Sequence, residues 1–276
     1  GKPWETPKPE TIDQSDFSTS ITLTRANMLY VPLSCLSAKA VNYFKRMAAF
    51  HNPEFYAKQG MRLSTHDVPR IISCSELTDK FIAMPRGCED DVVELLSANN
   101  VRYSIDDKTC HGRAINVSFK GGLREEQQQA MSSMFPHPVG TLSATTAFGK
   151  TVFAIAMIAQ RKVNTLILVH RKSLLDQWKK QLNDFLEISE VVVDNSTRRK
   201  KHLSPIGELC SGKDSLHGVI DIALIQSCLE SNEVKSFVRD YGMVIVDECH
   251  HVSSVSFEQV LKQVNAHYVY GLTATP

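Results

Sequence analysis

The sequence lacks the patterns that would place it in a membrane or in a disulfide-linked fold. None of its apolar runs approaches the roughly 20 residues of a membrane-spanning helix, and Gly1-Lys2-Pro3-Trp4 does not open a signal peptide. The seven cysteines form no Cys-x-x-Cys pair and show no regular spacing, and His250-His251 has no third ligand at a suitable distance in sequence. We therefore expect a cytoplasmic protein with reduced thiols, no zinc site and no membrane partner.

The sequence also lacks an excess of charge of either sign. Lys and Arg together number 31 and Asp and Glu number 30, which leaves a formal net charge of +1. Contact with a polyanion would therefore depend on local basic patches. The run Arg198–His202 is one candidate and Arg62, Arg70 and Arg86 are others. A solvated loop explains the run Arg198–His202 about as well as nucleic-acid binding does. An ordinary charged exterior explains the three arginines equally well.

Composition and pattern divide the 276 residues into three parts. Residues 1–20 are rich in Pro, Ser and Thr and predict a loose leader or linker. Residues 21–120 predict a small α+β accessory domain, which is a candidate nucleic-acid-binding module. Within it the order strand, Pro-x-x-Cys, helix occurs twice, around Pro32 and around Pro85. Internal duplication and coincidence both explain that recurrence.

Residues 121–276 follow Gly121-Gly122 and alternate between short apolar β runs and amphipathic helices. This alternation is typical of a parallel sheet covered by helices on both faces, so we predict an α/β doubly wound domain. Helices are expected at 150–161 and over the apolar series from Leu174 to Phe185. The predicted strands are 141–143, 165–169, 191–193, 220–225, 243–246 and 268–270.

A phosphate-binding loop is predicted between the first of these strands and the helix at 150–161. The segment ends in Gly-Lys-Thr, although Ala144 replaces the first glycine of the usual pattern and Ala147 stands where glycine is frequent. Lys150 would reach the β- and γ-phosphates, and Thr151 would place its hydroxyl on Mg²⁺. The residues expected to surround the nucleotide phosphates are Thr145, Thr146, Ala147, Phe148, Gly149, Lys150 and Thr151.

Two acids follow the buried strand at 243–246. Because open α/β sheets bind ligands beyond the carboxyl ends of their strands, Asp247 and Glu248 are expected to face the phosphate loop. Asp247 would hold Mg²⁺ through its water shell, and Glu248 would orient and deprotonate the attacking water. Lys150, Asp247 and Glu248 are therefore the predicted catalytic residues.

These motifs, taken in order, resemble the DExH helicases of superfamily 2, and the resemblance covers residues 121–276. Asp247-Glu248-Cys249-His250 is similar to the family's second motif and Thr273-Ala274-Thr275-Pro276 to its third. The resemblance implies a RecA-like first domain in which His250, Thr273 and Thr275 couple the nucleotide to the nucleic acid. Leu123-Arg124-Glu125-Glu126-Gln127 is similar to the family's entry motif, which implies that Gln127 reads the adenine edge and that Arg124 packs nearby.

Two further segments are similar to the family's nucleic-acid contacts. The resemblance places Arg171 and Lys172, at a strand-to-helix junction, and Gln226 and Ser227 against the backbone of the nucleic acid. Contacts of this kind give affinity without sequence preference. An exposed polar loop is the alternative explanation.

The resemblance implies an ATP- and Mg²⁺-dependent motor on DNA, with duplex favoured and RNA as the alternative. It also implies a second RecA-like domain beyond Pro276 that supplies arginines for phosphoryl transfer, so this chain alone is expected to hydrolyse ATP poorly. A nucleotide-gated binding unit without its own turnover is the second hypothesis. A small-molecule kinase is the third, and it leaves the Thr-Ala-Thr-Pro segment unexplained.

Overall fold

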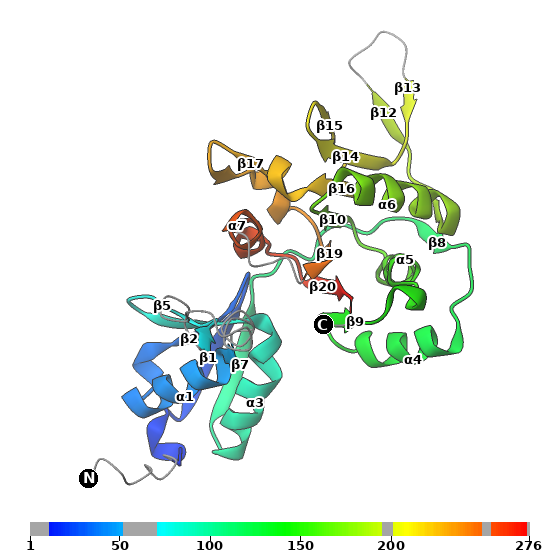
Figure 1. Cartoon of the computed structure of the whole chain (residues 1–276). Helices are drawn as coiled ribbons and strands as arrows, with labels where there is room; N and C mark the ends of the chain where they lie inside the picture. The colour runs from blue at the N-terminus through cyan, green and yellow to red at the C-terminus, as the bar shows by residue number, and fades with distance from the viewer. Residues whose placement is uncertain (1–10, 52–70, 195–200, 250–254, 275–276) are drawn as a thin grey trace, which may run out of the picture. The chain divides into compact units, whose positions relative to one another are not determined.

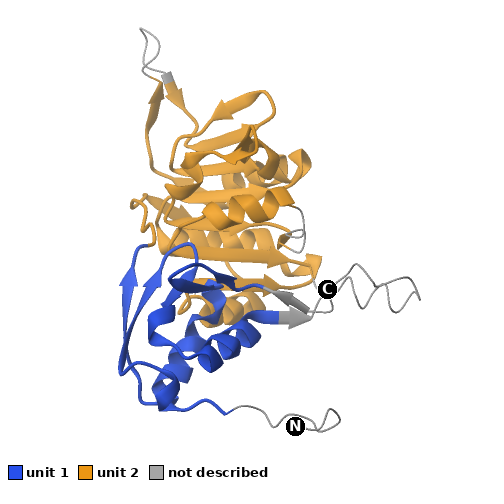
Figure 2. Cartoon of the chain, turned by 90° about the vertical axis from the view of Figure 1, so that its left-hand side faces the viewer, with its two compact units in different colours: residues 1–108 blue, residues 109–276 orange. Residues whose placement is uncertain are grey.

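A computed structural model describes residues 11–51, 71–194, 201–249 and 255–274. The chain divides into two compact units, residues 1–108 and 109–276 (Figure 2). This division falls earlier than the boundary expected at Gly121, because the segment after Lys108 packs with the second unit. Its strand β8 (Val117–Phe119), which the sequence placed in the accessory domain, pairs with β11 (Leu186–Ile188).

In its described residues, the first unit contains a five-stranded sheet and the helices α1 (Ala38–Ala48) and α3 (Glu89–Ala98). The strand order is β5-β6-β2-β1-β7, in which β1 and β7 are parallel and the remaining pairs antiparallel. A separate pair joins β3 (Ala49–His51) to β4 (Ile71–Ser73). The strands are β1 (Ser20–Arg25), β2 (Leu29–Pro32), β5 (Glu76–Leu77), β6 (Phe81–Met84) and β7 (Arg102–Asp107).

The repeated sequence pattern has a structural counterpart in this unit. Strand β2 leads through the 3-10 turn Leu33–Cys35 into α1, and β6 leads through the 3-10 turn Arg86–Cys88 into α3. The two strands are antiparallel neighbours, and Phe44 and Leu96 of the two helices are fully buried in the same core. The two segments therefore contribute to one hydrophobic core.

The packed chain begins before the Ile21 that the sequence suggested. Asp13 caps a short 3-10 helix, Gln14–Asp16, through its bond from the Ser15 amide. Phe17 is only 9% exposed and stacks edge-on against Phe44. The prediction of a loose leader through residue 20 is therefore wrong for residues 13–17, because one aromatic side chain anchors them in the core.

The second unit is a seven-stranded sheet in the order β15-β14-β16-β10-β19-β20-β9 (Figure 1). All neighbours are parallel except β15, which forms an antiparallel hairpin with β14 at one edge. The strands are β9 (Val139–Ser143), β10 (Thr165–Val169), β14 (Ile206–Cys210), β15 (Lys213–Ser215), β16 (Ile220–Leu224), β19 (Met243–Val246) and β20 (Tyr268–Thr273). The predicted doubly wound α/β domain is confirmed.

Side chains of the central strands alternate between two cores. Ile167 and Val169 of β10 join the core beneath α5 (Lys150–Arg161) and α6 (Lys172–Phe185), whereas Leu166 and Leu168 join the opposite core with α7 (Val255–Gln263). Because both faces are covered, β19 is apolar along its whole length and β10 from Leu166 to Val169, without alternation with polar residues.

The two helices α5 and α6, which cover the same face of the sheet, differ in how they are buried. All seven residues from Phe153 to Ala159 of α5 are buried, so this helix is enclosed on every side. Helix α6 is amphipathic and buries only Leu175, Trp178 and Leu182. The remaining elements are α4 (Glu125–Met134), the hairpin of β12 (Val192–Asp194) with β13 (Lys201–Leu203), and the hairpin of β17 (Leu229–Glu230) with β18 (Glu233–Val234). Across the described residues, no helix has the length and apolarity to span a bilayer.

Candidate functional site

The predicted phosphate loop joins β9 to α5 at the carboxyl edge of the sheet (Figure 1). It contains a 3-10 turn, Thr146–Phe148, and reaches α5 through Gly149, whose φ of 76° lies in the left-handed region. A side chain there would be strained, and its Cβ would lie 2.9 Å from Gln127 Nε2. Ala147 keeps a negative φ, so the turn accommodates the alanine that replaces a frequent glycine.

Lys150 closes the loop on itself. Its Nζ donates to the carbonyl oxygens of Ala144 at 2.8 Å and Thr145 at 3.1 Å. Thr151 follows in the first turn of α5, where the helix presents free N–H groups to an anion. The exposed face of the loop consists of Thr145, Thr146 and Ala147. The ammonium group therefore stands at the loop with two neutral acceptors that a phosphate oxygen could replace.

The two residues of the entry motif lie beneath the loop. Gln127 is 3% exposed, accepts from the Arg124 amide at 2.9 Å and donates to the Phe148 carbonyl at 2.7 Å. The Arg124 guanidinium donates to the carbonyls of Ala147 and Phe148 at 2.8 and 2.6 Å. In this arrangement the side chains of Gln127 and Arg124 both bond to the backbone of the loop. That Gln127 reads adenine stays a prediction.

The acid pair follows β19, directly beside β20 and one strand further from β9. Asp247 is 7% exposed and accepts from Trp178 Nε1 at 2.8 Å through Oδ2 and from the Glu248 amide at 2.9 Å through Oδ1. Burial raises the pKa of Asp247 above its ordinary value, and the two N–H donors oppose that rise because they stabilise the ionised form. The carboxylate is thus oriented by two donors from different elements.

Glu248 leaves the strand through a strained turn. Its φ of 50° is in the left-handed region, which a residue with a Cβ rarely adopts. Its carboxylate lies 3.2 Å from His170 Nε2 and 3.4 Å from Arg171 Nη2, both in the connection from β10 to α6. The predicted general base therefore contacts the same connection that carries the predicted nucleic-acid contacts.

The third motif begins on β20, the ladder neighbour of β9. Ala144 N donates to the Thr273 carbonyl at 3.2 Å, so the start of the phosphate loop is tied to the start of this motif. The Thr273 hydroxyl donates to the Ala274 carbonyl at 3.0 Å. His250 and Thr275, the other predicted coupling residues, lie outside the described residues.

The predicted nucleic-acid contacts come from two neighbouring strand ends. Gln226 Nε2 lies 3.5 Å from the His170 carbonyl, which brings the 3-10 turn Ile225–Cys228 against the start of α6. Lys172 pairs with Asp176 at 3.0 Å, and this bond raises the pKa of Lys172. Ser227 lines a groove shared with residues of the β14–β15 hairpin, including Lys213. Arg62, Arg70 and most of the run at 198–202 lie outside the described residues.

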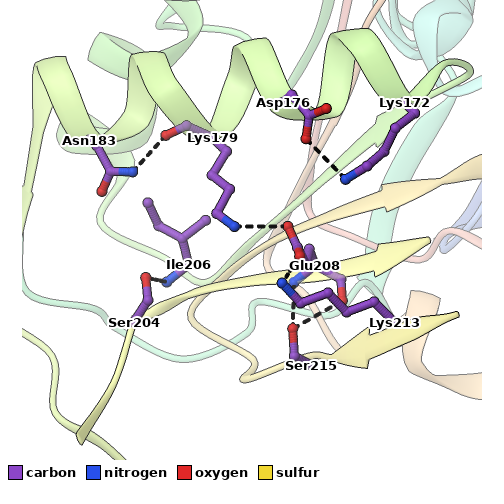
Figure 3. A network of polar contacts seen from close by, with 9 residues as sticks. All are labelled: Lys172, Asp176, Lys179, Asn183, Ser204, Ile206, Glu208, Lys213 and Ser215. Carbon is purple, nitrogen blue, oxygen red and sulfur yellow. Dashed lines mark hydrogen bonds and ion pairs between the residues drawn. The ribbon is translucent and has the colours of Figure 1, made fainter. Parts of the chain in front are cut away.

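An ion-pair network on the same face of α6 as Lys172 and Asp176 joins this helix to the sheet (Figure 3). Lys179 of α6 and Lys213 of β15 converge on Glu208 of β14, which is 4% exposed. Burial alone would raise the pKa of Glu208, but the two lysines lower it on balance. The network connects the β14–β15 hairpin to α6, a contact that the sequence alone does not predict.

Sequence reasoning missed two residues that the structure brings to the acids. Trp178 was assigned only to the apolar face of its helix, and His170 to a strand end. For Trp178 a signal was available, because a buried indole N–H usually has a hydrogen-bond partner. The strand order was needed to show that the partner is Asp247.

The parallel sheet, the loop with a left-handed glycine before a helix, and the buried acid on an adjacent strand together define a P-loop domain of the RecA-like type. Residues 120–276 match the family described as "Type III restriction enzyme, res subunit", and the chain belongs to this family. The resemblance to superfamily 2 helicases is therefore confirmed.

Individual relatives agree with this assignment. The chain is 36% identical over 165 residues to a protein named as helicase 109L of Invertebrate iridescent virus 3, covering 57% of this chain and 46% of that protein. It is 27% identical over 154 residues to the "DNA 3'-5' translocase XPB2" of Sulfurisphaera tokodaii, covering 56% of this chain and 31% of that protein. The chain thus spans less than half the length of these relatives.

A solved structure shares the fold of nearly the whole chain. The UvsW helicase of bacteriophage T4 superimposes with a TM-score of 0.58 at 13% identity and covers 92% of both chains. Because the match extends over more than the RecA-like domain, it also includes most of the first unit.

Proposed function

We propose that this chain is the ATP-binding part of an ATP- and Mg²⁺-dependent nucleic-acid motor, acting on DNA with duplex favoured. The observation that carries the proposal is the meeting of three groups at one edge of the sheet. These are the phosphate loop around Lys150, the acids Asp247 and Glu248, and the β10–α6 connection that carries Arg171.

The residues present fit a magnesium nucleotide. The loop offers backbone N–H groups, one ammonium and a helix start, which suit a polyphosphate. Each carboxylate oxygen of Asp247 accepts one hydrogen bond, from Trp178 or from the Glu248 amide. Further lone pairs therefore remain to accept hydrogen bonds from the water shell of a cation. Thr151 and Asp247 would hold Mg²⁺, which neutralises phosphate charge when it is bound.

The chain's own side chains would bind the phosphates, hold the loop and accept the proton of the attacking water. Lys150 would exchange the carbonyls of Ala144 and Thr145 for phosphate oxygens. Arg124 and Gln127 would hold the loop backbone in its nucleotide-binding conformation through their hydrogen bonds to the loop carbonyls. Glu248 would accept the proton of the attacking water once its carboxylate leaves His170 and Arg171.

The contact between Glu248 and Arg171 supports a link between nucleic acid and hydrolysis. Arg171 is 58% exposed at its side chain and stands where the family contacts the nucleic-acid backbone. A phosphate that draws the guanidinium away would release the base, which explains why turnover should depend on nucleic acid. We also propose that Lys172, Gln226 and Ser227 contact the backbone, that residues 21–120 engage the same substrate, and that His250, Thr273 and Thr275 couple the two sites.

The test is ATP turnover by the full-length protein with and without duplex DNA. Lys150→Ala should abolish nucleotide binding, whereas Lys162→Ala, at the exposed far end of the same helix, should leave it intact. Glu248→Gln should retain nucleotide binding and lose turnover. Binding without any DNA-stimulated turnover would favour the nucleotide-gated binding unit, and unchanged hydrolysis in Glu248→Gln would refute the role of the base.

A further inference from the structure

One buried hydrogen bond joins helix α6 to the predicted magnesium acid. Trp178 Nε1 donates to Asp247 Oδ2 at 2.8 Å, across 69 residues of sequence. Trp178 is 1% exposed and Asp247 is 7% exposed, so solvent does not compete strongly for either group. This is the contact through which α6 reaches the nucleotide site.

The geometry leaves the carboxylate little freedom. Trp178 holds Oδ2 and the Glu248 amide holds Oδ1, so rotation about the last side-chain bond would break both bonds. The indole itself cannot turn, because it is packed in the core beneath the sheet and its N–H is donor only. A rigid neutral donor of this kind orients an acid without neutralising its charge.

Helix α6 is itself held firmly. Leu175 and Leu182 are fully buried on its apolar face, and Lys179 pairs with Glu208 on the sheet. The indole therefore stands at a position set by the packing of the whole helix, and the acid takes its orientation from the helix.

We propose that Trp178 is a positioning residue for Asp247, holding the carboxylate in the orientation that the magnesium ion of the bound nucleotide requires. The proposal rests on the proposed function, since it assumes that Asp247 meets a magnesium nucleotide. Partners that orient a metal-binding group in this way typically contribute about 10–100-fold to metal affinity.

The first test measures how the affinity for a fluorescently labelled ADP depends on Mg²⁺ concentration. The Trp178→Phe variant keeps an aromatic ring but loses the N–H donor. In this variant, half of the Mg²⁺-dependent gain in ADP affinity should require about 10–100 times more Mg²⁺ than in the wild type. Affinity for the nucleotide in EDTA should be unchanged. Leu182→Ala is the matched control, because it also removes buried volume from α6 and should leave the Mg²⁺ dependence as it is.

A merely structural role for Trp178 predicts a different result. It would weaken binding equally with and without Mg²⁺, as in the control, and that outcome would overturn the proposal. In an Asp247→Asn background the additional change Trp178→Phe should have no effect on the Mg²⁺ dependence, because the two residues act through one contact. An additive effect of the two changes would also overturn the proposal.

The second test leaves the contact intact, so it stands even if Trp178→Phe folds poorly. The sequence contains two tryptophans, Trp4 and Trp178, so Trp4→Phe makes Trp178 the sole indole reporter. Adding Mg²⁺ to the ADP-bound protein should change its emission, and emission that stays unchanged while ADP is bound with Mg²⁺ would overturn the proposal. Absence of ADP binding by the wild type under any condition would instead overturn the proposed function, and the inference with it.

Discussion

Replacement of Gln127 by alanine distinguishes a residue that braces the phosphate loop from one that recognises the base. The side chain makes two well-formed hydrogen bonds, at 2.9 Å from the Arg124 amide and at 2.7 Å to the Phe148 carbonyl. Each neutral bond contributes about 1 kcal/mol net. If both bonds serve the nucleotide-binding shape of the loop, Gln127→Ala should weaken nucleotide binding by about 2 kcal/mol, or about 30-fold.

The decisive quantity is the ratio of ATP to GTP affinity, measured by calorimetry on the 276-residue chain. Because the bonds of Gln127 end on the loop backbone, both nucleotides should lose affinity equally and the ratio should stay constant. Gln128→Ala is the control, since the Gln128 side chain is exposed and donates to Leu123, away from the loop. A loss of tenfold or more for ATP alone would show that Gln127 reads adenine and would refute the bracing role.

Two further predictions concern α6 and its surroundings. Arg171→Ala should weaken DNA binding uniformly across sequences and reduce the slope of log affinity against log salt by about 1, whereas Lys180→Ala on the same helix, 81% exposed, should change neither; a change in sequence preference would contradict a backbone contact. Glu208→Gln should lower the free energy of unfolding at neutral pH by about 1 kcal/mol in denaturant titrations, the order of a partly exposed ion pair. Since the pKa of Glu208 is lowered on folding, its contribution is present above the ordinary pKa of the group and is lost as pH falls through the folded value. The two proteins should therefore converge in stability in acid, and a constant difference down to low pH would contradict the ion-pair origin.

Sequence pattern was most informative where chemistry and periodicity agreed. The strand Thr165–Val169 and the helix Lys150–Arg161 were predicted at the bounds that the structure shows, since a continuous apolar run and a phosphate-loop helix each have few alternative structures. The acids of Asp247-Glu248 were placed at a strand end because β19 is uniformly apolar before them.

What could not be predicted depends on contacts between distant segments. Val191–Val193 is predicted as a strand of the α/β domain, yet among the described residues β12 pairs with β13 in a separate two-stranded sheet. The strand Ile206–Cys210 was missed, because Gly207 and Glu208 interrupt its apolar pattern. Glu208 pairs there with Lys213 across the β14–β15 hairpin and with Lys179 of α6, which is 29 residues away and which no local pattern brings to it.

The position of β9 at the end of the sheet order has a dynamic consequence. Among the described residues β9 has a ladder partner on one side only, β20, whereas β10 is paired on both sides. Local opening is easiest at such an edge, so the amides of Val139–Ser143 should exchange with deuterium sooner than those of β10. The strand that leads into the phosphate loop can therefore shift with less disruption of the core than β10 can, while its pairing with β20 would carry that shift to the Thr-Ala-Thr segment.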